Sequence, residues 1–210
     1  MDETTRIPDA LIELRDFLDA QGWDYCLIGG LAAGRWGEAR FTHDIDVVVK
    51  AEFGLEMDVA KPLLKKFKAR YPDAVTFAKT NRIVLVSATN GIGIDISLGG
   101  LLFEDTMVSR ATDIRILSHV DFRTARPEDI VVMKSIAARP IDIKDIEGII
   151  AAQGKKLDEK YIRHWLAELA ELWTEVDVVG VFETAFKSVG DRIKTKATTP
   201  RPKKPKPKED

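Results

Sequence analysis

The sequence has very few of the residues that build disulfides or zinc sites. One cysteine, Cys26, occurs in 210 residues, and there are only three histidines, none of them near it. A single cysteine excludes an internal disulfide, and the absence of Cys/His clusters argues against zinc. No apolar run is long enough to span a bilayer, and the polar start (1–9) does not resemble a secretory signal. We therefore expect a cytoplasmic protein without membrane contact.

The chain also has little net charge. It contains 32 Lys+Arg and 34 Asp+Glu, for a formal charge of -2. Eight basic and three acidic residues fall in the segment 191–210, so the rest of the chain is acidic. An acidic body is not typical of a dedicated nucleic-acid-binding surface, although it leaves room for one local basic cleft. The Lys- and Pro-rich segment 191–210 is predicted to be disordered.

Hydrophobic periodicity predicts a mixed α/β first half and a helical second half. The expected helices are 8–20, 31–36, 57–70, 130–138, 141–152, 157–175 and 178–189. The expected strands are 25–28, 45–49, 83–87 and 92–97, with weaker ones at 75–78 and 114–117. Asn90-Gly91 is a hairpin signal between two of these strands. We expect an α/β (α+β) fold in which a mixed sheet is flanked by helices. Its core would be 1–125, with a helical annex at 126–190 that completes the site.

Two glycines and two aspartates form the first chemically informative pattern. The apolar run 25–28 ends in Gly29-Gly30, and a second apolar run opens with Asp44 and Asp46. A glycine turn that leads from a strand into a helix exposes backbone N–H groups that bind phosphate. Residues two apart in a strand share a face, so the two carboxylates repel unless a cation such as Mg²⁺ lies between them. Each piece alone is equally a turn acid or a plain strand-to-helix turn.

A third carboxylate, Asp95, lies inside the apolar strand predicted at 92–97. An unpaired charge is costly there, and a metal site would offset that cost. If this strand neighbours the one that carries Asp44 and Asp46, three carboxylates meet. Two could hold Mg²⁺, while the third bridges a second metal or takes the proton from an attacking hydroxyl. The alternative is a salt bridge from Asp95 to a cation such as Arg82.

These residues, in this order, resemble the nucleotidyltransferase superfamily of the polymerase-β type. The segment 40–43 resembles the start of the Arg-x-Thr-x-Asp-x-Asp motif found in small bacterial members. The resemblance implies that the helix start at Gly29 and Gly30 binds a nucleoside triphosphate. It also implies that Asp44, Asp46 and Asp95 hold two Mg²⁺ ions.

A second block, 129–145, resembles the later motifs of AbiEii-type toxins, which are nucleotidyltransferases of bacterial toxin–antitoxin systems. This likeness implies that Lys134 contacts the triphosphate, that Arg139 supports it, and that Asp142 and Asp145 complete the site. The residues alone leave other interpretations open. Lys134 is equally a solvated helix lysine, Arg139 could anchor a kink, and Asp142 could cap a helix. The Gly-Gly motif also differs from the Gly-Ser of many toxins, so a hydroxyl contact to phosphate is missing.

The two resemblances together imply a Mg²⁺-dependent enzyme that moves a nucleoside monophosphate from an NTP to a hydroxyl. We expect Asp44, Asp46, Asp95 and Asp142 to be catalytic, with catalysis by positioning and charge neutralisation. The toxin likeness implies a tRNA or protein acceptor and an antitoxin partner. Two alternatives stay open: a transferase acting on a small molecule such as an aminoglycoside, and a non-catalytic nucleotide-binding module. An extended basic rim would favour tRNA, and a narrow acidic pocket would favour the cationic drug.

Overall fold

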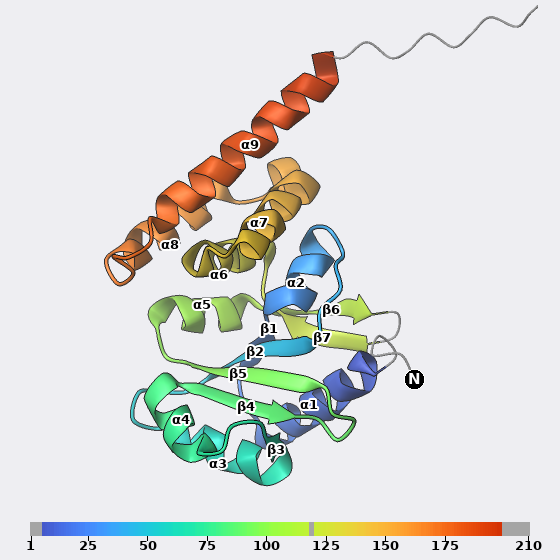
Figure 1. Ribbon diagram of the computed structural model, residues 1–210, viewed down its shortest axis with the longest axis vertical. Coiled ribbons are helices and arrows are strands. Elements are labelled where there is room, and N and C mark those ends of the chain that lie inside the picture. The colour runs from blue at the N-terminus through green and yellow to red at the C-terminus, as the bar shows by residue number, and fades with distance from the viewer. Residues whose placement is uncertain (1–5, 118–119, 199–210) are drawn as a thin grey trace, which may run out of the picture.

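The computed structural model describes residues 6–117 and 120–198, which form a seven-stranded sheet covered by helices (Figure 1). The strands are β1 (Tyr25–Leu27), β2 (Asp44–Lys50), β3 (Lys68–Ala69), β4 (Ile83–Ser87), β5 (Gly93–Gly99), β6 (Thr112–Leu117) and β7 (Val120–Thr124). The helices are α1 (Ile7–Gln21), α2 (Gly29–Trp36), α3 (Glu56–Lys66), α4 (Ala74–Asn81), α5 (Leu102–Arg110), α6 (Pro127–Ala137), α7 (Pro140–Gln153), α8 (Glu159–Ala170) and α9 (Val178–Thr198).

The sheet is mixed, as predicted, and its strand order is β3-β4-β5-β2-β1-β7-β6. The central pair β2 and β5 is parallel, and its register places Asp46 opposite Asp95. Strand β4 is antiparallel to β5, and the two-residue edge strand β3 is antiparallel to β4. The two acidic strands that the sequence predicts are therefore neighbours.

Alternation along the strands separates a dry face of the sheet from a polar one. On β2 and β5 the side chains of Ile45, Val47, Ile94 and Ile96 are fully buried on one face. The intervening acids point to the other face, since successive strand residues alternate. Figure 1 shows α1, α3 and α4 on one side of the sheet and α2 and α5 on the other, with α6 to α9 stacked beyond them.

Several local predictions differ from the structure. The predicted helix 157–175 is shorter and ends at Ala170. The predicted strand 75–78 is wrong, because these residues belong to α4, whose start is capped by the Asp73 carboxylate accepting from the Thr76 N–H. The predicted helix 57–70 ends at Lys66, after which the chain becomes extended at Phe67 and forms β3. Helix α5 and strand β7 were not predicted. In α5 the exposed Leu102 weakens the apolar periodicity on which prediction depends.

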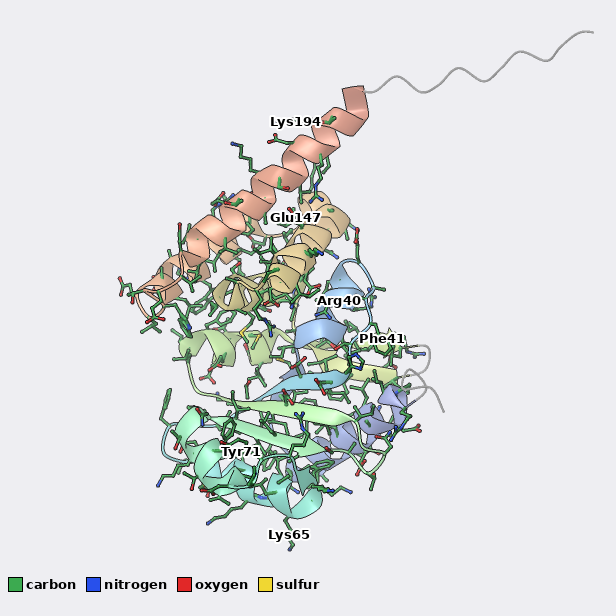
Figure 2. The ribbon with its side chains drawn as sticks, viewed as in Figure 1. Arg40, Phe41, Lys65, Tyr71, Glu147 and Lys194 are labelled. Atoms are coloured by element: carbon green, nitrogen blue, oxygen red, sulfur yellow. The ribbon has the colours of Figure 1, made fainter. Side chains whose placement is uncertain are left out.

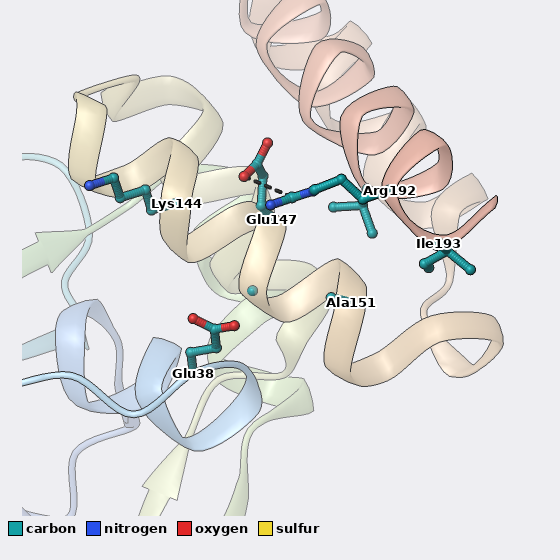
Figure 3. Close-up of a pocket in the computed structure, with 8 residues that line it drawn as sticks. Glu38, Lys144, Glu147, Ala151, Arg192 and Ile193 are labelled. Carbon is teal, nitrogen blue, oxygen red and sulfur yellow. Dashed lines mark ion pairs between the residues drawn. The ribbon is translucent and has the colours of Figure 1, made fainter. Parts of the chain in front are cut away.

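The prediction that 191–210 is disordered is wrong for the first residues of that segment, where the last helix continues. Residues 191–198 of the predicted tail continue α9, and 199–210 lie outside the described residues. The helix persists because neither proline nor glycine interrupts 191–198 and because Arg192 pairs with Glu147 of α7 at 2.8 Å. Figure 3 shows this ion pair at a cavity of about 380 Å³ between α7, α9 and the loop that carries Glu38.

The helices in the described part of the chain include none that is long and apolar enough to cross a membrane.

Candidate active site

A cavity of about 400 Å³ lies over β2 and β5, at the N-terminal end of α2. Its volume is in the usual range of small-ligand sites. Segments far apart in the sequence line it: the turn before α2, the starts of β2 and β5, and the junction between α6 and α7. Most of the predicted site residues line this one cavity, namely Gly29, Gly30, Asp44, Asp46, Asp95, Lys134, Arg139 and Asp142. Asp145, also predicted to complete the site, does not line it and lies behind Lys134.

The glycine turn is fitted to one of the acids. Gly29 has φ +64°, a conformation that L side chains rarely adopt, and a Cβ there would collide with the Asp46 carboxylate. The Gly30 N–H donates a hydrogen bond to that carboxylate. The Ile28 N–H donates to the Asp46 carbonyl at 2.9 Å, so backbone groups also join the turn to β2. Only glycine at position 29 allows the start of α2 to lie this close to Asp46.

The aspartates of β2 form an electrostatically strained pair. Burial raises the pKa of Asp46, and the charge of Asp44 raises it further. The Gly30 N–H, Lys134 and Arg139 act in the opposite direction without cancelling the effect. Opposite Asp44 the neighbouring strand has Gly93, where a Cβ would collide with the Asp44 carboxylate. The site therefore makes room for two carboxylates and leaves them short of positive partners.

Asp95 has a cationic partner, but a different one from the arginine predicted as its alternative. Its carboxylate accepts a hydrogen bond from the Arg70 guanidinium. Arg82 instead pairs with Glu56 and donates to backbone carbonyls, among them that of Leu98 at 2.9 Å. The alternative of a salt bridge at Asp95 is therefore confirmed, with Arg70 in place of Arg82. The Arg82 example is wrong because Arg82, at the end of α4, is turned toward the far end of β5.

Within the described residues, no three His, Cys, Asp or Glu side chains are arranged to hold a metal ion. In this arrangement Gly30 binds the Asp46 carboxylate and Arg70 binds that of Asp95. The donor set of Asp44 and Asp46 nevertheless fits Mg²⁺, which takes one or two carboxylates and completes its shell with water and phosphate. A divalent cation would also relieve the repulsion that raises the pKa of Asp46.

The helical wall of the cavity holds a buried network of charges. Lys134 is only 5% exposed, and its Nζ lies 2.8 Å from Asp142 and 2.7 Å from Asp145. Arg40, on the loop between α2 and β2, reaches the Asp145 carboxylate with two nitrogens, at 2.9 and 3.1 Å (Figure 2). Arg139 donates to Asp142 at 2.6 and 3.1 Å. Each buried carboxylate thus has two cationic partners.

This network decides several open interpretations from the sequence. Lys134 is not a solvated helix lysine, because it is buried and paired. Asp142 is not an N-cap; it is the third residue of α7, and it accepts a hydrogen bond from the Arg139 N–H at 3.2 Å. Burial alone would raise the pKa of Asp142, but hydrogen bonds from Arg139 and Lys134 lower it overall. Lys134 and Arg139 meet on Asp142 because the helix breaks between them at Ala138, which has φ +50°.

The glycine turn, the acids of β2 and β5 and the cations of the helical wall together offer the groups that a phosphate-bearing ligand requires. Residues 8–179 match the family described as "Nucleotidyl transferase of unknown function (DUF2204)". The chain belongs to this nucleotidyl transferase family. In sequence, no curated protein matches it.

Three solved structures resemble this nucleotidyl transferase at low identity. One is an antigenic nucleotidyltransferase-like protein from Paracoccidioides brasiliensis, at 17% identity and TM-score 0.48, covering 86% of this chain and 91% of that one. Another is the antibiotic-resistance factor ANT(2'')-Ia, at 13% and 0.48, covering 93% and 98%. The third is the Thermotoga maritima CCA-adding enzyme, solved in complex with tRNA, at 13% and 0.35, covering 89% and 66%.

Two glycines hold the helical wall of this transferase against α2. A Cβ at Gly37, just after α2, would lie 2.8 Å from the backbone N of Ile149 in α7. From the other side, a Cβ at Gly148 would lie 3.4 Å from the backbone N of Glu38. The two backbones are therefore in direct contact, close to the loop from which Arg40 reaches Asp145.

Sequence reasoning missed Arg70 and the apolar part of the lining. Ile130, Met133 and Ile141 line the cavity beside the charged groups, and Ile141 is 40% exposed. Residues 61–70 contain five basic and no acidic residues, which is a signal that could have identified Arg70. The pairing of Arg70 with Asp95 depends on a two-residue edge strand, which is too short to produce a recognisable pattern.

Proposed function

We propose that this nucleotidyl transferase uses two Mg²⁺ ions, as the resemblance to polymerase-β-type enzymes implies, to move a nucleoside monophosphate from an NTP to a hydroxyl acceptor. The observation that supports this most strongly is the single cavity where the glycine turn, Asp44, Asp46 and Asp95 meet Lys134 and Arg139. One side offers oxygen ligands for cations, and the other offers cationic groups for phosphate.

In this proposal the two walls bind different parts of the nucleotide. The start of α2 at Gly29 and Gly30 receives the triphosphate through backbone N–H groups. The ammonium group of Lys134 has three N–H donors. Two of them are directed at Asp142 and Asp145, so one is left for a phosphate oxygen. Arg139, whose side chain is 69% exposed, supports the same phosphates. Asp142, predicted to be catalytic, acts through these two cations as a positioning residue.

The chemical step then needs one proton acceptor. Asp95 accepts the proton of the attacking hydroxyl, whose oxygen forms a bond to the α-phosphorus as the bond to pyrophosphate breaks. Asp44 and Asp46, with Asp95, would hold the Mg²⁺ ions. When bound, Mg²⁺ neutralises charge on the triphosphate.

The proposal is tested with full-length protein, Mg²⁺ and each NTP labelled at the α-phosphate, offered tRNA, total protein or an aminoglycoside as acceptor. We expect label transfer that requires Mg²⁺, is abolished by chelation, and falls about 10³-fold or more in Asp46→Asn. Asp16→Asn, at an exposed position on α1, is the matched control and retains activity. Full activity of Asp46→Asn, or the absence of both NTP binding and transfer in the wild-type protein, would contradict the proposal.

We also propose that the transferase is the toxin of a toxin–antitoxin system, acting in the cytoplasm on a tRNA or a protein. The likeness of 129–145 to AbiEii-type toxins supports this role. Induced expression in a bacterial host should arrest growth for the wild-type protein and not for Asp46→Asn, and a cognate antitoxin should restore growth. Equal growth of both strains would contradict the toxin role. The aminoglycoside offered in the transfer assay tests the alternative of a cationic small-molecule acceptor.

A further inference from the structure

A strip of positive charge runs from α3, on one side of the sheet, around the edge strand β3 to Arg70, next to the candidate active site. It consists of Lys61, Lys65, Lys66, Lys68 and Arg70, with no acidic residue among 61–70. These residues run from α3 into and just past β3. We refer to them as the basic strip. It stands out because the body of the chain is acidic.

A second cavity, of about 780 Å³, lies along this edge. Its lining includes Lys66, Lys68 and Arg70 of the strip, together with Glu13 of α1 and Ser87 of β4, whereas Lys61 and Lys65 line a separate pocket beside α1. Arg70 connects the two cavities, because it lines this one and its guanidinium donates to Asp95 of the other. A ligand lying in the second cavity would therefore end beside the proposed proton acceptor.

Strand register gives this connection a defined geometry. The Arg70 N–H donates to the Leu85 carbonyl at 2.9 Å. Leu85 pairs with Asp95, which pairs with Asp46, so these residues form one row across the sheet. Lys68 begins the next row, in which Ser87 and Gly93 lead to Asp44. Because residues in one row share a face, Lys68 and Arg70 lie on the face that carries the carboxylates.

Most of the strip is exposed, and most of its lysines have no acidic partner among the described residues. Within the part of the chain that the structure describes, Lys61, Lys65 and Lys68 are exposed and form no ion pair, while Lys66 lies 3.3 Å from Glu13. The chain continues from Arg70 into Tyr71, which is 45% exposed and stacks at 4.3 Å on Phe77. In the view of Figure 2, Tyr71 lies between Lys65 at the far end of the molecule and Arg40 at the first cavity.

We propose that the basic strip and Tyr71 bind a single-stranded RNA acceptor and direct its terminal hydroxyl to Asp95. This inference rests on the proposed function. Cations along a groove, with further exposed lysines beside it and an exposed aromatic ring on which a base can stack, are a combination that binds single strands. Arg70 then has two partners: Asp95 when the groove is empty, and an RNA phosphate when the acceptor is bound.

The test compares two triple variants of the full-length protein. Lys61→Gln/Lys65→Gln/Lys68→Gln removes the unpaired lysines of the strip. Lys144→Gln/Lys160→Gln/Lys187→Gln removes the same charge from exposed positions on α7, α8 and α9. The probe is a fluorescent single-stranded RNA of about 12 nucleotides with a free 3′ hydroxyl, titrated at several salt concentrations. Since both variants keep 191–210, the basic end of the chain contributes equally to each.

We expect the strip variant to bind the RNA about tenfold more weakly at low salt, and the slope of log K against log salt to fall by about 2, as expected for three lost phosphate contacts. The control variant should match the wild-type protein. Tyr71→Ala should weaken binding with no change in the salt slope, because stacking releases no counterions.

Equal RNA affinity in the two triple variants would overturn the proposal, as would transfer of label to protein but not to RNA. NTP affinity, measured on the same proteins, separates this failure from that of the proposed function. If the wild-type protein binds NTP and transfers label but the strip variant behaves as wild type, the proposed nucleotidyl transfer stands and the proposed RNA groove is wrong. A wild-type protein that binds no NTP loses both.

Discussion

The two walls of the candidate active site treat charge in opposite ways. On the sheet wall, three partly exposed carboxylates share one ion pair, that of Arg70 with Asp95. On the helical wall, Asp142 and Asp145 are buried, and each is held by two cations. Burial raises the pKa of Asp46 on the first wall, whereas the pKa of Asp142 on the second is lowered overall.

The difference shows which charges await a ligand. A buried network in which every group is hydrogen-bonded is rigid, and removing one member is costly. Carboxylates that face each other across strands without enough cations cost folding energy, and such groups are candidates for function. We therefore interpret the helical wall as the support and the sheet wall as the part that ligands complete. The predictions below test this division.

The largest stability effect is expected at the centre of the helical wall. Lys134→Met removes the cation shared by Asp142 and Asp145 and leaves buried carboxylates short of a partner. We expect a loss of about 3–5 kcal/mol in the free energy of unfolding, measured by urea titration. Lys144→Met, at an exposed position of α7, is the control. A loss below about 1 kcal/mol would show that the network is not the support of this wall.

Gly29→Ala tests the contact between the glycine turn and the sheet wall. We expect a loss of about 1–3 kcal/mol, together with loss of transfer, because the added methyl group displaces the Asp46 carboxylate. Gly22→Ala is a matched control, since Gly22 also has a positive φ (+67°) but nothing within 4 Å of an added Cβ. Gly22→Ala should lower the free energy of unfolding only by the cost of an alanine at positive φ, and transfer activity should be retained. Equal effects of the two substitutions on transfer would contradict a role of the turn in the site.

Asp46→Asn should stabilise the protein while it abolishes transfer. The amide keeps an acceptor for the Gly30 N–H and removes the buried charge, so in the presence of a chelator we expect a gain of about 0.5–2 kcal/mol. The folded-state pKa of Asp46 is raised, so its ionised carboxylate lowers the free energy of unfolding. This loss of stability is fully present above the folded-state pKa and absent below the pKa of the unfolded chain. Thermal unfolding of both proteins should therefore converge as the pH falls toward about 3.9. If Asp46→Asn is less stable than wild type at neutral pH, the interpretation that the charge of Asp46 destabilises the sheet wall is wrong.

The smallest stability effect is expected at Arg139, the exposed member of the helical wall. Because its side chain is 69% exposed, Arg139→Gln should cost less than about 1 kcal/mol in unfolding free energy. If Arg139 supports the triphosphate, the same variant should raise KM for NTP several-fold and change kcat little. An unchanged KM would assign Arg139 to the support of Asp142 alone.

The part of the site that follows from strand patterns could be predicted, and the part that depends on edges and helix junctions could not. Alternation along one strand already places Asp44 and Asp46 on a shared face. Asp95 joins them because its strand pairs with theirs, which the sequence left as a condition and the structure supplies. The burial of Lys134 depends on the break at Ala138, where a non-glycine residue adopts positive φ, and no sequence signal marks that position.

Local signals misled at α4 for a physical reason. The β-branched and aromatic residues of 75–78 favour a strand, but the cap at Asp73 and packing against α3 favour a helix. The mixed-sheet prediction survived this error because it depended on the central strands, whereas 75–78 lies outside the sheet. The site lies on β2 and β5, so its prediction was equally unaffected.

The backbone contact at Gly37 and Gly148 bears on how a ligand can enter the cavity. Because α7 touches the end of α2 backbone to backbone, any opening of the helical wall there has to break this contact. Another side of the cavity faces β4, whose residues Ile83, Leu85 and Ser87 are half-exposed, and Arg70 lies on this side. If nucleotide and acceptor both enter from this side, they share one entrance, and the fold then determines the order in which they bind.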